Sequence, residues 1–90
     1  MKVTFEFKGS IFNLKTPVCL ELDENSTILS ALKLVISKYG HLNQLLFKDN
    51  NIRNDIIILV DKIDVLSMKL LDAPLMNGQK ITILPLAHGG

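Results

Sequence analysis

The sequence has 90 residues, which suffices for one small domain and leaves no room for a separate substrate-binding half. Hydrophobic residues make up 48% of it and charged residues 21%, a composition that is typical of a packed core and excludes a chain disordered throughout. Ten basic and nine acidic residues give a formal net charge of +1, so neither a nucleic acid nor an anionic membrane is favoured as a direct partner.

The cellular compartment is predicted from the cysteine content and from hydropathy. Cys19 is the only cysteine, which excludes an internal disulfide and favours a reducing compartment. No apolar run approaches the roughly 18 residues of a bilayer span, and residues 1–3 lack the pattern of a secretion signal. We therefore expect a cytoplasmic protein.

Two strands are predicted in the first quarter of the chain. Apolar and polar residues alternate over residues 2–8 and again over residues 17–22, which is the period of a half-buried strand. The side chains expected to face the core are Val3, Phe5, Phe7, Val18, Leu20 and Leu22. The loop that joins the strands, residues 9–16, is longer than a tight turn, and we expect the two strands to pair as a hairpin.

One long helix is predicted next. Ser26 or Thr27 provides the N-cap, and Gly40 is expected to end the helix as its C′ residue. Between these positions the apolar residues recur with helical spacing and form one stripe. The stripe consists of Ile28, Leu32, Val35, Ile36 and Tyr39.

The second half of the chain predicts shorter elements. Residues 41–54 have the least clear pattern, with a short helical turn around Leu42, Leu45 and Leu46 followed by an exposed loop. Residues 56–60 are all apolar and mostly β-branched, which predicts a strand buried on both faces, and residues 65–68 are expected to form a short return strand. The Asn-Gly turn at residues 77–78 precedes a last strand over residues 80–85.

The order of these elements is strand, strand, helix, strand, short strand, strand. A sheet of this size can be covered on one face by one main helix of about four turns. We therefore expect an α+β domain.

Several kinds of active site are excluded by the residues present. The sequence has no G-x-x-x-x-G-K and no G-x-G-x-x-G pattern, so we expect no bound nucleotide cofactor. His41 and His88 have no second histidine or cysteine at ligand spacing, which argues against a metal site. Cys19 lies in a predicted strand without a basic neighbour and is read as an ordinary strand residue. An autonomous enzyme is therefore not expected.

The last twenty residues carry a more specific signal. Residues 71–78 (LDAPLMNG), the strand residues 81–85 (ITILP) and the ending 86–90 (LAHGG) together resemble the β-grasp, ubiquitin-like sulfur carriers and protein modifiers. This group includes the molybdopterin synthase small subunit, the thiamine-pathway sulfur carrier, the archaeal small modifiers and the ubiquitin-related modifier. The His-Gly-Gly ending is most similar to the ubiquitin-related modifier. Residues 41–54 have no clear counterpart in these families.

The resemblance implies a fold and a chemistry. The fold would be a β-grasp domain over residues 1–85, with a mixed sheet of four to five strands, followed by a tail over residues 86–90. A partner enzyme of the ubiquitin-activating type would use ATP to adenylate the carboxylate of Gly90. A persulfide on another protein would convert the adenylate to a thiocarboxylate that donates sulfur for tRNA thiolation or, with the molybdopterin synthase large subunit, for molybdopterin. Conjugation to lysines of target proteins is the other route.

The tail residues have different expected roles. Gly90 is the reacting residue, and Gly89 avoids a Cβ that would collide with the walls of a partner's active site. Extended residues span about 3.3 to 3.6 Å each, so residues 86–90 reach roughly 17 Å. The residues expected to contact the partner are Leu84, Pro85, Leu86, Ala87 and His88. The alternative function is a noncovalent ubiquitin-like interaction module with no chemistry at its end.

Overall fold

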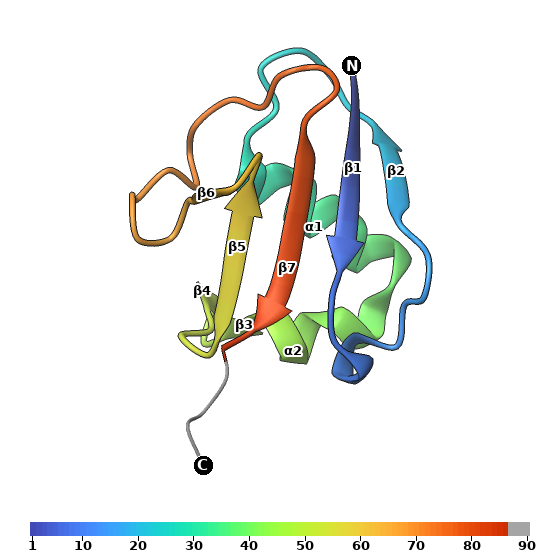
Figure 1. The fold of residues 1–90 in the computed structure, drawn as a ribbon, viewed down its shortest axis with the longest axis vertical. Helices are drawn as coiled ribbons and strands as arrows, with labels where there is room; N and C mark the ends of the chain where they lie inside the picture. Colours follow the sequence, from blue (N-terminus) through green and yellow to red (C-terminus); the bar gives the residue numbers. More distant parts are fainter. Residues whose placement is uncertain (87–90) are drawn as a thin grey trace.

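The computed structural model describes residues 1–86, and residues 87–90 lie outside the described part. A five-stranded sheet with the strand order β2-β1-β7-β5-β6 forms one layer, and the main helix α1 crosses one of its faces (Figure 1). The elements of these two layers are β1 (Lys2–Phe7), β2 (Val18–Glu21), α1 (Ile28–Lys38), β5 (Ile56–Val60), β6 (Ile63–Asp64) and β7 (Lys80–Pro85). The predicted α+β domain with one main helix on one face of the sheet is confirmed.

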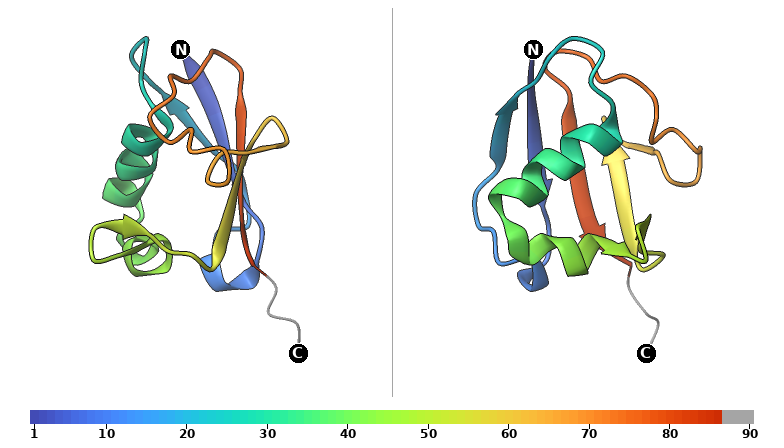
Figure 2. Two further views of the ribbon diagram at one scale, coloured as in Figure 1. Left: turned by 90° about the vertical axis from the view of Figure 1, so that its left-hand side faces the viewer. Right: turned by 180° about the vertical axis from the view of Figure 1, so that it is seen from behind.

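The sheet is mixed because two of its three inner strands, β1 and β7, run in the same direction. β1 and β7 are parallel, with Phe5 opposite Ile81, whereas β2 pairs with β1 and β5 pairs with β7 in antiparallel fashion. Both helical segments lie on the same side of the sheet, and no helix covers the other side within residues 1–86 (Figure 2). We call this uncovered side the open face.

Helix α1 begins after Thr27, one of the two predicted N-caps, and its first turn contains a capping box. The hydroxyl of Thr27 accepts a hydrogen bond from the amide of Ser30 at 3.1 Å, and the hydroxyl of Ser30 accepts one from the amide of Thr27 at 3.0 Å. Ile28, Leu32 and Val35 are buried as expected. The first four amides of a helix have no intrahelical partner, so side chains that bond to two of them fix where the helix begins.

The helix ends where the sequence predicts, with Gly40 at the C′ position, but Gly40 has a different conformation from the expected one. Tyr39 is the C-cap, and Gly40 does not have the positive φ of a left-handed C′ residue. Gly40 instead begins the 3-10 turn η2 (Gly40–Leu42), which leads into the short helix α2 (Asn43–Leu46). This path places Leu42 and Leu46 fully inside the core, which a chain reversal at Gly40 would prevent.

The core lies between α1 and the sheet and extends under α2. Its members are apolar, and no buried side-chain nitrogen or oxygen in the described residues lacks a hydrogen-bond partner. Aromatic rings of β1 and of the following 3-10 turn η1 (Ser10–Phe12) contribute at one end, where Phe7 and Phe12 lie with ring centroids 5.5 Å apart. The largest fully buried side chains are Phe5, Phe12, Leu20, Leu32, Leu42, Leu46, Ile58, Ile81 and Ile83.

Residues 41–54 contain one element that the sequence did not predict. The short helical turn around Leu42 is confirmed, but the expected loop after it is a small hairpin of β3 (Phe47–Lys48) and β4 (Asn51–Ile52). Asp49 and Asn50 form its two-residue turn with φ of 53° and 67°. Aspartate and asparagine tolerate this left-handed conformation, so the pair can close a tight hairpin.

Two expectations about residues 56–68 are wrong. β5 is buried on one face only, because Ile57 and Leu59 on the open face have no helix above them and are half-buried. The return strand β6 also comes earlier than residues 65–68. Asp61 and Lys62 form a two-residue turn with φ of 47° and 75°, so pairing with β5 starts directly at Ile63.

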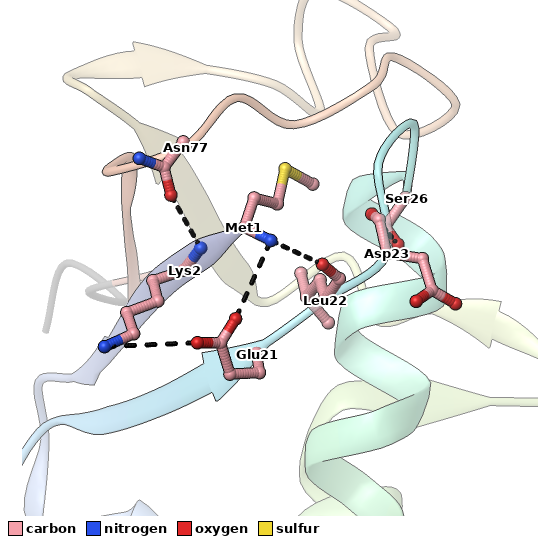
Figure 3. A network of polar contacts seen from close by, with 7 residues as sticks. All are labelled: Met1, Lys2, Glu21, Leu22, Asp23, Ser26 and Asn77. Atoms are coloured by element: carbon pink, nitrogen blue, oxygen red, sulfur yellow. Dashed lines mark hydrogen bonds and ion pairs between the residues drawn. The ribbon is translucent and has the colours of Figure 1, made fainter.

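The Asn-Gly turn holds the start of β1. The amide of Lys2 donates to Oδ1 of Asn77 at 2.8 Å (Figure 3). The amide of Gly78 donates to the Lys2 carbonyl at 2.7 Å. Gly78 has a φ of 86°, which favours glycine. The amino group of Met1 also donates to the Leu22 carbonyl at 2.8 Å. The last strand, β7, thus leaves a fixed turn and ends at the opposite end of the sheet (Figure 1).

No helix within residues 1–86 has both the length and the apolar character that crossing a membrane requires.

Candidate functional site at the end of the last strand

The predicted site residues fall into two groups. Leu84, Pro85 and Leu86 form the end of β7 and the first residue after it. Ala87, His88, Gly89 and Gly90 lie outside the described residues, so their predicted roles stay predictions. The same holds for the boundary between a domain over residues 1–85 and a tail over residues 86–90. The site is therefore described from the end of β7 and from what surrounds it.

Leu84 lies on the open face of the sheet. Ile81 and Ile83 are fully buried under the helices, and the alternation of a strand turns Leu84 the other way. Leu84 pairs with Ile57 of β5, and Leu59 follows Ile57 on the same side. All three side chains are half-buried and form an apolar surface that we call the open-face strip. Its position beside the end of β7 makes it a candidate contact surface.

A group of charged side chains borders the strip on the β1 side. Nζ of Lys80 lies 2.7 Å from Oε2 of Glu6, and Nζ of Lys8 lies 3.5 Å from its Oε1. The hydrogen bond from Lys80 is the main cause that lowers the pKa of Glu6, which stays ionised at neutral pH. The open face thus has an apolar half on β5 and β7 and a charged half toward β1.

Pro85 and Leu86 line a recess at the end of the sheet. The recess has a volume of about 230 Å³, and its apolar walls also include Ile11, Phe12 and Leu45. Leu86 is 43% exposed and Ile11 is 57% exposed, although both are large apolar residues. The recess therefore adds a second apolar surface next to the point where the described chain ends.

The structure also places Arg53 at this site, which sequence reasoning missed. Its guanidinium binds the carboxylate of Asp55 in bidentate fashion, with Nε and Nη2 at 3.0 and 2.8 Å from the two oxygens. This hydrogen-bonded carboxylate raises the pKa of Arg53. An Arg-x-Asp spacing before a strand was the available signal, because residues i and i+2 of an extended chain share one side.

Other titratable groups do not gather into a site within residues 1–86. Nε2 of His41 lies 2.7 Å from the carbonyl oxygen of Phe12 and connects η2 with η1. Cys19 is exposed on the open face, with its Sγ 3.8 Å from Oγ1 of Thr4. In this part of the chain no three histidine, cysteine, aspartate or glutamate side chains lie close enough together to hold a metal ion.

Comparisons with known proteins give matches in structure only. No protein-family model and no curated protein matches the sequence. SAMP1 from Haloferax volcanii matches with a TM-score of 0.86 and 16% identity over 100% of both chains. Urm1 from Trypanosoma brucei matches with a TM-score of 0.74 and 22% identity over 99% of this chain and 95% of its own. A chain of the BexX/CysO complex of Amycolatopsis orientalis matches with a TM-score of 0.74 and 24% identity, over 98% of this chain and 99% of its own length.

These similarities confirm the resemblance at the level of fold. The chain has the β-grasp fold of ubiquitin-like modifiers and sulfur carriers, and the match covers its whole length. The identities lie below 25%, so the fold is what the comparisons establish.

Proposed function

We propose that this protein is a ubiquitin-like sulfur carrier or protein modifier that acts through the carboxylate of Gly90. The observation that supports this most strongly is the full-length β-grasp match to SAMP1, Urm1 and CysO in a chain whose last strand leads into Leu-Ala-His-Gly-Gly. Fold alone leaves function open, and the ending supplies the reactive group that a carrier needs.

The chemistry requires a partner enzyme. A carboxylate is a poor electrophile at neutral pH, and the sequence has no phosphate-binding loop to activate it. In our proposal the Gly90 carboxylate attacks the α-phosphorus of ATP in the active site of an adenylating enzyme, which releases pyrophosphate and gives the acyl adenylate. The chain itself is a cosubstrate. Because Gly89 and Gly90 have no side chains, they can enter a narrow active site.

The adenylate then has two fates. A persulfide on a second protein displaces AMP, and a thiol cleaves the resulting acyl disulfide to leave a thiocarboxylate on Gly90. The thiocarboxylate supplies sulfur for tRNA thiolation or molybdopterin synthesis. Alternatively, a lysine amine of a target protein displaces AMP and forms an isopeptide bond.

The described surface provides the contact with the activating partner. The open-face strip lies beside the end of β7, and an apolar surface at this position can contact a protein that binds the tail. CysO has been solved in a complex with BexX, which supports a protein partner for a chain of this fold. Leu84 and Leu86 are the anchors that we propose for this contact, with Pro85, Ala87 and His88 between and after them.

Intact-mass spectrometry tests the proposal. The purified protein is incubated with an extract of its source cells, ATP and a sulfur donor, and its mass also establishes whether Gly90 is the terminal residue. A carrier gains the mass difference of sulfur replacing one oxygen, and this gain requires ATP. A noncovalent interaction module keeps its mass in every reaction, and that result would reject the proposal.

A further inference from the structure

The last described residue of the chain is held by a backbone hydrogen bond beyond the end of β7. The amide of Leu86 donates to the carbonyl oxygen of Asp55 at 2.8 Å. Pro85, the residue before it, is paired with Ile56 in the sheet. The Asp55 carbonyl therefore fixes the residue from which the predicted tail starts.

Asp55 is in turn held by Arg53. The two parallel hydrogen bonds of 3.0 and 2.8 Å between guanidinium and carboxylate define both the distance and the orientation of the pair. The side chains are 37% and 32% exposed, less than the 77% and 69% of the surface pair Lys2–Glu21. The amide of Arg53 also donates to the Leu46 carbonyl at 2.9 Å, and its Nη1 lies 3.4 Å from the Gln44 carbonyl. The Leu86 contact is thus connected to helix α2.

The loop after β1 contacts the same point of β7. Gly9 has a φ of 135°, and a Cβ on it would lie only 3.0 Å from Cδ of Pro85. The amide of Lys8 donates to the Ile83 carbonyl at 2.8 Å. A residue with a side chain at position 9 would push against Pro85, so the glycine permits this close approach. Two separate segments therefore determine where β7 ends.

We propose that Arg53 and Asp55 are positioning residues that set the direction in which the tail leaves the domain. This inference rests on the proposed function, because a defined direction is useful only to a tail that must enter another protein's active site. Because Leu86 is already held in the free protein, binding requires a smaller loss of conformational entropy from the tail. Without the pair, only a fraction of the molecules would have the tail in the direction that the activating enzyme binds. The apparent affinity for that enzyme would then be the intrinsic affinity multiplied by this fraction.

The test compares variants of the pair in the full-length protein. Arg53→Gln and Asp55→Asn each remove one charge with little change in shape, and Arg53→Lys keeps the charge but loses the bidentate geometry. Lys48→Gln is the matched control, because it removes an exposed positive charge from the β3–β4 hairpin that directly precedes Arg53. The measurements are KM and kcat for adenylation and the hydrogen-exchange rate of the Leu86 amide. A thermal melt shows that each variant is folded.

We expect a separation of the two kinetic constants. Arg53→Gln and Asp55→Asn should raise KM by about 3- to 10-fold with kcat within about twofold of the parent, because only the competent fraction changes. The Leu86 amide should exchange several-fold faster, Arg53→Lys should lie between parent and Arg53→Gln, and Lys48→Gln should match the parent. The double variant should be no worse than either single one, because both break the same interaction.

Two results contradict the inference in distinguishable ways. An activated parent whose Arg53→Gln and Asp55→Asn variants keep the parent KM or the parent Leu86 exchange rate would overturn this inference alone. A parent that is never adenylated would overturn the proposed function and the inference with it. If Arg53→Gln does not fold, Asp55→Asn and Arg53→Lys decide the matter by the same measurements.

Discussion

Leu32 has no solvent exposure and lies on the buried stripe of α1. Leu32→Ala should lower the free energy of unfolding by about 2 to 5 kcal/mol, through lost transfer energy and the cavity that remains. For a domain of this size each kcal/mol corresponds to about 4 to 8 °C in the melting temperature. A thermal melt should therefore shift by roughly 10 °C or more.

Leu34 provides the matched control for this change. It lies on the same helix but is 36% exposed, so Leu34→Ala removes the same atoms from a site that packs less tightly. The melting temperature should then change by only a few degrees. Equal shifts for both variants would mean that the helix does not pack on the sheet in the way described.

Cys19 is expected to be dispensable for the sulfur chemistry. Its thiol is exposed on the open face of the edge strand β2, whereas β2 is separated from β7 by β1. Cys19→Ser should leave the melting temperature nearly unchanged and thiocarboxylate formation intact. A folded serine variant that accepts no sulfur would show that Cys19 carries a persulfide, and the proposed route through the Gly90 carboxylate alone would be wrong.

At the scale of secondary-structure elements, the pattern of apolar residues predicts the elements whose side chains form the core. The limits of the last strand, the buried stripe of α1 and its cap at Thr27 all follow from local spacing and capping chemistry. These features depend on neighbours within a few residues of each other. They were therefore readable from the sequence.

The errors about β3, β4 and β6 have a common cause in the positive-φ turns. Asp49-Asn50 and Asp61-Lys62 close two-residue hairpins, and neither pair contains the glycine that usually signals such a turn. Without that signal the sequence predicts a loop in place of β3 and β4 and a later start for β6. The contacts of Arg53 with the carbonyls of Gln44 and Leu46 were also not predictable, since they join Arg53 to a helix that only the folded chain brings close.

The pairing of β1 with β7 should make stability depend on pH through Glu6. Lys80 and Lys8 hold the pKa of Glu6 below its ordinary value of 4.5. The unfolded chain therefore binds this proton at a higher pH than the folded chain does, and the stabilising effect is present above pH 4.5 and is lost as the pH falls through the folded value.

Glu6→Gln removes this contribution. Chemical unfolding should show the parent slightly more stable than the variant at pH 7, and the difference should vanish at a pH well below 4.5. The group is solvent-accessible, so 1 M salt should also shrink the difference at pH 7. A difference that persists unchanged at low pH would assign the stabilisation to packing of the side chain instead of its charge.

The open-face strip leads to a prediction about β7. Leu84→Asp should weaken adenylation by the activating enzyme, because a charge in a desolvated contact surface is costly. The half-buried position makes a moderate loss of stability tolerable, so the variant should still unfold cooperatively in a thermal melt. Met76→Asp, at a 67% exposed apolar residue before β7, is the matched control and should be activated like the parent. Unfolding of the Leu84 variant would instead make Leu84 part of the core.

At the scale of the whole molecule, the residues that stabilise the fold and the residue proposed to react lie in different parts of the chain. Within residues 1–86 the buried hydrophobic side chains all lie between Val3 and Ile83, whereas the proposed reacting group is Gly90. A change beyond residue 86 leaves each of these side chains in place. The melting temperature and the activation of the carboxylate should therefore respond to different substitutions.

Deletion of Gly90 and the substitution Gly89→Val test this division. Removing Gly90 shortens the reach of the carboxylate by about 3.5 Å, and a misplacement of only 1 Å can cost about a hundredfold in rate. Gly89→Val keeps the carboxylate but adds a β-branched side chain next to it, which stiffens the backbone and widens the chain. Both variants should melt like the parent and yield no adenylate or thiocarboxylate by intact-mass spectrometry. A chain without Gly90 that is activated at the parent rate would exclude the carrier chemistry and leave the noncovalent interaction module as the function.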